Sequence, residues 1–268
     1  MPPPIRAPGW EPAAEGLLPL GAEVVLICAP LDLPEGDLAR LRATFSPQEE
    51  ARARKFAPQF RDRWVAGRGL LRSILGAATG ADPAALRFNY GEHGKPALNP
   101  LSAPALSGRA LSFNVSHSGG LGLYALARGS EVGVDIEQIR PRRSDQVADR
   151  FFHPREAARL GQIDDESERR SAFFAIWCCK EAFIKATGAG LSQSMSSFEF
   201  ELSAQGPVAV AWHEGDPQAA ARWSVHQLAP ATGYAGALIV ERTPDALQPT
   251  IRRLWWAGEG TALVRLRA

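Results

Sequence analysis

The sequence predicts an α+β protein made of two similar-sized lobes. Helical stretches and strand-like runs occur in both halves in the same order, a strand, then helices, then antiparallel strands, with Gly129-Ser130 between the halves. The length of 268 residues, 45% of them hydrophobic and 22% charged, allows two cores in an ordinary globular chain. We therefore expect lobes over 23–130 and 131–243. A Pro/Gly-rich arm (1–22) would precede them and a C-terminal extension (244–268) would follow.

In the first lobe, the β-branched run 24–28 predicts a strand, and Ser46-Pro47 predicts a helix start with serine as the cap. A second helix is expected over 61–75, ending at Gly76. Alternation over 86–90 predicts a strand that runs into a turn-rich loop, 91–96. The segments 112–118 and 122–127 are expected to form a hairpin through Gly119-Gly120.

The second lobe is expected to begin with a strand over 132–139, followed by helical stretches over about 145–160 and 168–187. Four strands are then expected, over 197–202, 208–213, 222–228 and 234–241. The tail carries Trp255-Trp256 and a short closing strand, whose role the sequence leaves open.

Charge and composition exclude several classes of protein. The chain has 30 basic and 29 acidic residues, a net charge of +1, which argues against a nucleic-acid-coating protein. No apolar run reaches membrane-span length, and Met1-Pro-Pro-Pro lacks a signal-peptide pattern. Cys28, Cys178 and Cys179 fit neither a disulfide framework nor a zinc site. We therefore expect a cytoplasmic protein that does not bind membranes or nucleic acid.

Asp135 and Glu137 are candidate metal ligands. Both lie in the run Gly133-Val-Asp-Ile-Glu137, and residues i and i+2 of a strand share a face, so the two carboxylates lie side by side. Val134 and Ile136 would anchor the other face in a core. Paired carboxylates with substrate phosphates are a usual Mg²⁺ arrangement, and the alternative is a solvated acidic strand face.

Glu181 and Lys185 lie one turn apart on a predicted helix, 173–185, with Gly188 as its stop. The ordinary interpretation is a surface ion pair. However, an apolar stripe that includes Phe173 and Trp177 leaves this helix little solvated face. A carboxylate and an ammonium beside Asp135 would provide a metal ligand or base and a proton donor.

Two further patterns are weaker. Ser116-His117 at a strand end fits either an anion contact or a turn, and no nucleophile-elbow motif surrounds it. A set of basic residues fits either a phosphate site or a solvated helix face: Arg52, Arg54, Lys55, Arg61, Arg63 and Lys95.

In this order, the motifs resemble the 4′-phosphopantetheinyl transferases of the surfactin-synthetase-activating type, the large, broad-specificity class. The resemblance covers roughly 24–240. The blocks that carry it are Ser46-Pro47, Tyr90-Gly-Glu-His-Gly-Lys-Pro96, Phe113-Asn-Val-Ser-His-Ser118, Gly133-Val-Asp-Ile-Glu137, Phe151-Phe-(x3)-Glu156, Trp177-(x2)-Lys-Glu-(x3)-Lys185 and Gly188-x-Gly-Leu191. The resemblance implies two pseudo-twofold-related lobes, each a small, mostly antiparallel sheet packed with helices.

The resemblance also implies a reaction. Coenzyme A binds between the lobes, and a serine hydroxyl of an apo carrier protein attacks the phosphorus that bears the pantetheine arm, releasing 3′,5′-ADP. Asp135, Glu137 and Glu181 match the Mg²⁺ ligands, with Mn²⁺ as a substitute. Glu181, or a metal-bound water that it positions, matches the base. Lys185 would protonate or stabilise the leaving phosphate, and the catalytic set is Asp135, Glu181 and Lys185.

The residues that match coenzyme A contacts form a larger set. It consists of Arg52, Arg63, Lys95, Ser116, His117, Asp135, Lys180 and Lys185, with Arg52 and Arg63 at the 3′-phosphate. Glu49 stands where the family commonly has a basic residue, so we expect a less positive 3′-phosphate pocket, with Arg54 or Lys55 compensating. Glu156 matches an acidic position near the reaction centre.

The partners implied are apo carrier proteins or carrier domains of polyketide, nonribosomal-peptide or fatty-acid synthases. Carrier proteins are acidic, so Arg140, Arg142 and Arg143, with Phe151 and Phe152, form a candidate docking surface. A solvated loop is the alternative for the arginines. By analogy with the family we expect a monomer.

Two other functions share some of these residues. A catalytically silent relative that binds coenzyme A or a carrier would not need the full set of carboxylates and lysines. A metal-dependent phosphohydrolase would share the carboxylates but would need neither coenzyme A nor a docking surface.

Overall fold

The computed structural model describes residues 8–12, 17, 19, 23–103, 110–141, 144–203, 206–214, 216, 218–242 and 248–256. The first lobe contains β1 (Glu11–Pro12), β2 (Glu23–Pro30), α1 (Glu35–Arg42), α2 (Pro47–Ala53), α3 (Pro58–Thr79), β3 (Phe88–Tyr90), β4 (Pro96–Leu98), the 3₁₀ helix η1 (Pro100–Ser102), β5 (Leu111–Ser118) and β6 (Leu121–Arg128).

The rest of the described chain forms the second lobe and a final strand. The elements are β7 (Val132–Gln138), α4 (Ser144–Phe151), α5 (Pro154–Gly161), α6 (Glu166–Thr187), η2 (Gly190–Ser192), η3 (Met195–Ser197), β8 (Phe198–Ser203), β9 (Gly206–His213), α7 (Ala219–Arg222), β10 (Trp223–Leu228), β11 (Tyr234–Glu241) and β12 (Thr250–Trp255). This mixture of helices and small sheets confirms the predicted α+β class.

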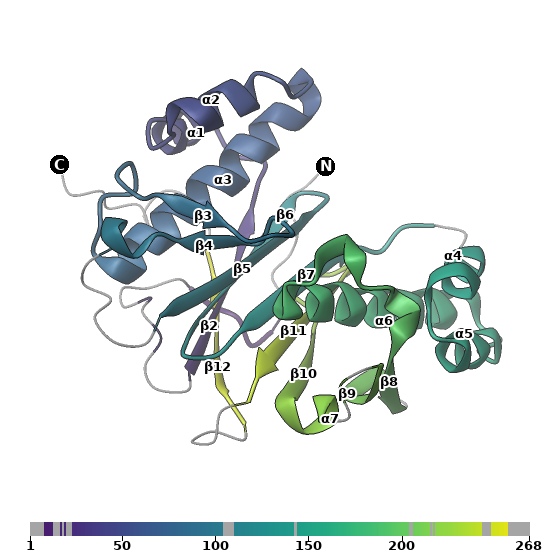
Figure 1. The fold of residues 1–268 in the computed structure, drawn as a ribbon. Coiled ribbons are helices and arrows are strands. Elements are labelled where there is room, and N and C mark those ends of the chain that lie inside the picture. Colours follow the sequence, from purple (N-terminus) through teal and green to yellow (C-terminus); the bar gives the residue numbers. More distant parts are fainter. Residues whose placement is uncertain are drawn as a thin grey trace.

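The two larger sheets form the middle layers of the molecule (Figure 1). One has the strand order β1-β12-β2-β6-β5, and the other has the order β10-β11-β7. Helix α3 packs on the outer face of the first through a core that includes Leu70, Ile74 and Tyr124. Helix α6 covers the second, and Phe183 and Ile239 belong to that core. Between the sheets lies a third core, so the helices enclose two packed sheets.

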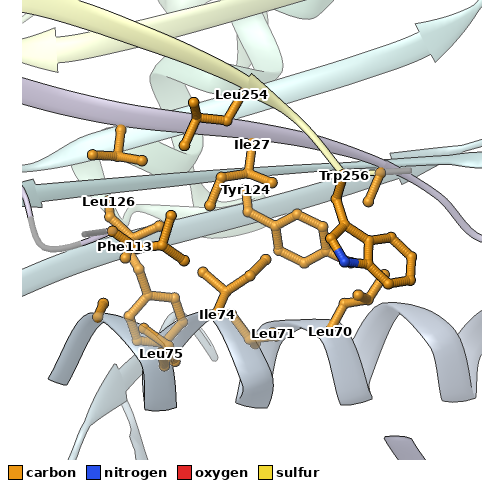
Figure 2. Close-up of a cluster of buried hydrophobic side chains, with 14 of the residues drawn as sticks. Ile27, Leu70, Leu71, Ile74, Leu75, Phe113, Tyr124, Leu126, Leu254 and Trp256 are labelled. Carbon is orange, nitrogen blue, oxygen red and sulfur yellow. The ribbon is translucent and has the colours of Figure 1, made fainter. Parts of the chain in front are cut away.

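The tail described as an extension has a definite place. Strand β12 lies between β1 and β2 in the first-lobe sheet and runs parallel to both. Trp256, which follows it, is 1% exposed and packs among the apolar side chains between this sheet and α3 (Figure 2). The end of the described chain therefore completes the first lobe rather than the second.

Two predicted helix boundaries are wrong. Helix α3 continues past Gly76 to Thr79 and ends at Gly80, whose φ of 70° is left-handed. A side chain at position 76 would lie 2.7 Å from Pro83, so this glycine permits a close turn rather than ending the helix. The stretch 145–160 is two helices because Pro154 starts α5, with His153 as its cap.

Candidate active site

Helix α6 packs directly on strand β7, and Gly133 permits this contact. A Cβ at Gly133 would lie 2.0 Å from the backbone oxygen of Ala182 and 2.5 Å from the nitrogen of Ala186. Asp135 and Glu137 share this face of the strand, whereas Val134 and Ile136 lie in the core between the sheets. The absence of a side chain at position 133 therefore brings Glu181 and Lys185 of α6 close to the two strand carboxylates.

Asp135 is the centre of this cluster and is only 3% exposed. Its Oδ1 accepts hydrogen bonds from Ser116 Oγ and Lys185 Nζ, each at 2.7 Å. Its Oδ2 is also buried but has no hydrogen-bond partner among the described residues. An unpartnered carboxylate oxygen in a buried position is an acceptor that a bound cation would satisfy.

Glu137 and Glu181 add two more carboxylates to the cluster. Ser118 Oγ donates to Glu137 Oε2 at 2.7 Å. Burial raises the pKa of Glu181, and the negative charges of Asp135 and Glu137 raise it further against the opposing effect of Lys185. Asp135 and Glu137 are thus close enough to Glu181 to affect its ionisation.

Cys178, one of two adjacent cysteines on α6, is a protonated thiol and not a thiolate. Burial, followed by the negative charge of Asp135, holds the pKa of the Cys178 thiol well above its usual range.

In the present side-chain arrangement no three acidic, histidine or cysteine residues of the described chain form a ready metal site. The cation that Asp135 binds here is the ammonium of Lys185. The donors nevertheless fit Mg²⁺, because all are oxygens and one of them is unpartnered.

A cleft of about 890 Å³ opens in the first lobe. Arg52 from α2 and His117 from β5, two of the residues expected to contact coenzyme A, line it together with Tyr90 and the backbone of Gly94. His117 lies between Ser116 and Ser118, which bond Asp135 and Glu137. Three further arginines, Arg68, Arg72 and Arg87, also line the cleft but were absent from the predicted set. Their positive charge and the aromatic walls suit a phosphorylated aromatic ligand.

Glu49, which we expected to make the pocket less positive, is paired with arginines that line the cleft. Its side chain is half of a capping box with Ser46 at the start of α2. The carboxylate also forms ion pairs with Arg68 and with Arg72, at 2.7 Å to the latter. The compensating cations therefore come from α3. Arg54 instead pairs with Glu50 at the surface.

Lys95 joins the two lobes. Its Nζ donates to Glu131 Oε2 at 2.6 Å and to the backbone oxygen of Ala186, at the end of α6, at 3.0 Å. Arg63 is outside the residues that line the cleft, and its guanidinium forms a two-point contact with Asp32. The predicted coenzyme A contacts are thus spread over the cleft, the lobe junction and the carboxylate cluster.

The expectation for Lys180 needs correction. The side chain is 0% exposed, and its ammonium pairs with Glu156 at 2.7 Å. It also donates to the backbone oxygens of Met195 and Phe198. These three acceptors use all its protons, so Lys180 is a structural residue with no surface for coenzyme A. Glu156 belongs to this buried pair and not to the carboxylate cluster.

The candidate docking residues separate into three groups. Arg140 and Phe151 are exposed, and Arg140 bonds to the side chain of Gln138. Phe152 is 3% exposed and stacks on Phe173, so it is a core residue and the docking prediction is wrong for it. Arg142 and Arg143 lie outside the described residues.

Fold and site together define a class of protein, a two-lobed α+β protein with an acidic cluster beside a basic, aromatic cleft. The sequence pattern of the 4′-phosphopantetheinyl transferase superfamily matches residues 131–239. HetI, a 4′-phosphopantetheinyl transferase of Nostoc sp., is 39% identical over 233 residues, which cover 86% of this chain and 93% of that protein. The 4′-phosphopantetheinyl transferase Sfp of Bacillus subtilis is 32% identical over 182 residues, 68% of this chain and 76% of that one.

The chain belongs to the 4′-phosphopantetheinyl transferase family, and it is an enzyme. Among solved structures, the ACPS–CoA complex of Chronobacterium ammoniagenes matches 42% of this chain and 96% of its own, at 22% identity and a TM-score of 0.28. That score is too low to support a statement about this site. No helix among the described residues is both long and apolar enough to cross a membrane.

Sequence reasoning missed Arg68, Arg72, Arg87 and Ser118. The three arginines carry no motif of their own. Arg68 and Arg72 pair with Glu49, 19 and 23 residues away, whereas Arg87 donates to the backbone of the residues just before it. Ser118 lies in the block Phe113–Ser118 that carries the family resemblance. It is two residues from Ser116, and this spacing on a strand predicts that both side chains share one face.

Proposed function

We propose that the protein transfers the 4′-phosphopantetheine group of coenzyme A to a serine hydroxyl of an apo carrier protein, giving the holo carrier and 3′,5′-ADP. Family membership supports the reaction class. The single structural observation that carries the proposal is the buried, unpartnered Oδ2 of Asp135 within a carboxylate cluster that adjoins a basic cleft.

The nucleotide end of coenzyme A fits the first-lobe cleft. Arg52 and His117 would contact the phosphate on the ribose, and Tyr90 and Phe88 would offer aromatic surface to the adenine. Arg68 and Arg72 are already paired with Glu49, so they contribute less free charge. Lys180 is excluded from this set by its burial, and Arg63 would first have to leave Asp32.

Asp135, Glu137 and Glu181 would hold Mg²⁺, with Mn²⁺ as a substitute. A divalent cation there would neutralise charge on the pyrophosphate of coenzyme A and stabilise the charge that develops on transfer. Lys185, whose ammonium now bonds Asp135 and Ser116, would turn to the leaving phosphate and donate a proton or a hydrogen bond.

Glu181, or a water that it positions, is the proposed acceptor of the carrier serine's proton. Burial and the neighbouring carboxylates raise the pKa of Glu181 when no cation is bound. With a divalent cation on Glu181 this shift would be opposed, and a water that Glu181 positions would take the proton instead. The position of Glu181 one turn before Lys185 on α6 places the proton acceptor and the proton donor on one rigid element.

The partner would dock along α4, since Arg140 is exposed ahead of this helix and Phe151 is exposed at its last residue. An acidic carrier fits such a basic rim beside an apolar side chain. We place the enzyme in the cytoplasm as a monomer, with carriers of polyketide, nonribosomal-peptide or fatty-acid synthases as its partners. The reduced state and burial of all three cysteines fit that compartment.

The test is an intact-mass assay with purified protein, coenzyme A, Mg²⁺ and an apo carrier protein. The expected result is a mass gain of one phosphopantetheine on the carrier, absent when the carrier serine is replaced by alanine. Asp135→Ala should abolish the gain, and EDTA should abolish it reversibly. An unmodified carrier with every carrier class tested would overturn the proposal.

A further inference from the structure

Strand β5 of the first lobe lies alongside strand β7 of the second and contacts it through side chains. Alternate residues of β5 make these contacts. Ser112 Oγ donates to Glu131 at 3.2 Å, Asn114 Oδ1 accepts from the Val134 backbone at 2.9 Å, and Ser116 and Ser118 reach the carboxylates. We call these four residues, Ser112, Asn114, Ser116 and Ser118, the β5 polar row.

The β5 polar row replaces a backbone ladder along one edge of β7. The other edge pairs with β11 throughout its length. On the β5 side, the N–H groups of Val134 and Gln138 donate to the side chains of Asn114 and Ser118. The free edge of the carboxylate strand is therefore satisfied by side chains of the other lobe.

The hydrogen-bond partners fix the direction in which the Ser118 hydroxyl points. The N–H of Gln138 can only donate, so at 3.1 Å Ser118 Oγ must act as its acceptor. The hydroxyl proton is then available for Glu137 Oε2, a carboxylate oxygen that can only accept, at 2.7 Å. Ser118 is thus held as a donor to one oxygen of Glu137.

Ser116 follows the same logic toward Asp135. The Lys185 ammonium donates to Ser116 Oγ at 3.0 Å, which leaves the hydroxyl proton for Asp135 Oδ1 at 2.7 Å. Each strand carboxylate therefore has one oxygen bound by a serine of the β5 polar row. Only Ser116 was expected to have a role at the site.

We propose that Ser118 is a positioning residue, which holds Glu137 at the carboxylate cluster by binding Oε2. The inference rests on the proposed function, because it assumes that Glu137 is a metal ligand. Three carboxylates close together repel, and a glutamate at the end of a strand has rotamers that lead away from its neighbours. The Ser118 hydroxyl opposes this, so a side chain of the first lobe completes the metal site of the second.

The test measures Mn²⁺ binding to the carrier-free protein by electron paramagnetic resonance of free Mn²⁺. Ser118→Ala should weaken Mn²⁺ binding about 10-fold or more, the effect usual for the loss of a residue that orients a ligand. Ser118→Thr keeps the hydroxyl and should bind Mn²⁺ as the wild type does. Ser112→Ala, which removes an equivalent hydroxyl from the same row, should also leave Mn²⁺ binding unchanged.

Activity provides a second readout. With Ser118→Ala, raising the Mn²⁺ concentration should restore kcat, and the KM for coenzyme A should not change. A merely structural role would instead lower the thermal midpoint without a dependence on Mn²⁺. Equal Mn²⁺ affinity in Ser118→Ala and the wild type would overturn the inference, as would a Thr variant as weak as the Ala variant.

The two proposals fail in different ways. If the wild type binds Mn²⁺ through Asp135, and Ser118→Ala weakens it, but no carrier is modified, the proposed function fails and the positioning role stands. If carriers are modified but Ser118→Ala binds Mn²⁺ normally, only the positioning role fails. A wild type that binds no Mn²⁺ overturns the positioning role.

Discussion

Helix α6 supplies the lysines of two ion pairs, Lys180–Glu156 and Lys185–Asp135. In both pairs the lysine Nζ lies 2.7 Å from a carboxylate oxygen. In Lys180–Glu156 the side chains are 0% and 1% exposed, and every proton of the ammonium has an acceptor. In Lys185–Asp135 the lysine is 28% exposed and the aspartate keeps a partnerless Oδ2. Equal ion-pair geometry can therefore serve two purposes. The saturated pair holds the lobe together, and the unsaturated pair is available for chemistry.

The strongest test of this contrast is Lys180→Met, which should reduce the free energy of unfolding by about 3–5 kcal/mol because it leaves a buried, unpaired carboxylate. Denaturant unfolding measures it. The double variant Lys180→Met/Glu156→Gln should recover part of the loss, since it removes the buried charge and the amide oxygen still accepts from Phe200, whereas the amide nitrogen cannot accept from His153. A loss below about 1 kcal/mol in the single variant would contradict the structural role.

Lys185→Ala should have the opposite profile. We expect kcat to fall about 10²–10³-fold, the usual effect of removing a donor aimed at transition-state charge. Because Lys185 is partly solvated and the buried Asp135 keeps its hydrogen bond from Ser116, the free energy of unfolding should fall less than in Lys180→Met, by about 1–3 kcal/mol. Steady-state kinetics beside a denaturation curve checks both. A rise in KM for coenzyme A at constant kcat would assign Lys185 to binding instead.

How far the sequence predicts these features depends on the range of the interactions involved. Period-two alternation and turn glycines predicted β5, β6 and β7, and the apolar face of α6 and its stop at Gly188 were also predicted. These signals are local. They correctly placed Asp135 and Glu137 on one strand face, with Val134 and Ile136 on the other.

The long-range partners could not be predicted in the same way. Lys180 and Lys185 are equally charged on the same helix, and only the packing of Met195 and Phe198 over Lys180 distinguishes them. Glu49 has its arginine partners 19 and 23 residues away, about three and four turns into α3. Motif spacing says nothing about which charges become buried together.

Stabilisation against unfolding by a bound metal ion should distinguish the Lys185–Asp135 pair from the Lys180–Glu156 pair, with a smaller effect. At ten times its Kd, Mn²⁺ should stabilise the wild type by about 1.4 kcal/mol, since a ligand that binds only the folded state stabilises it by mass action. The effect should survive in Lys180→Met/Glu156→Gln and vanish in Asp135→Asn. Thermal unfolding with and without Mn²⁺ measures it. Protection that persists in Asp135→Asn would place the cation elsewhere.

The smallest effect expected is a pH dependence. Burial raises the pKa of Glu156, whereas the Lys180 charge lowers it, so Lys180→Met should raise it further. A carboxyl whose pKa is higher when folded stabilises the protein below its unfolded pKa and loses that contribution as pH rises through the folded pKa. The deficit of Lys180→Met relative to the wild type should therefore grow from pH 5 to pH 8, by at most about 1.4 kcal/mol per pH unit. A deficit independent of pH would contradict an ionised Glu156.

The position of β12 has a consequence for how the enzyme is made. Strand β12 follows the whole second lobe in the sequence, yet it lies between β1 and β2, and Trp256 then closes the core over α3. The first lobe therefore cannot finish folding during synthesis and must wait for the whole second lobe to appear. Until β12 is in place, the edge of β2 and the apolar side chains that pack against Trp256 are exposed to solvent. A chain cut before β12 should accordingly leave the first lobe open and prone to aggregation.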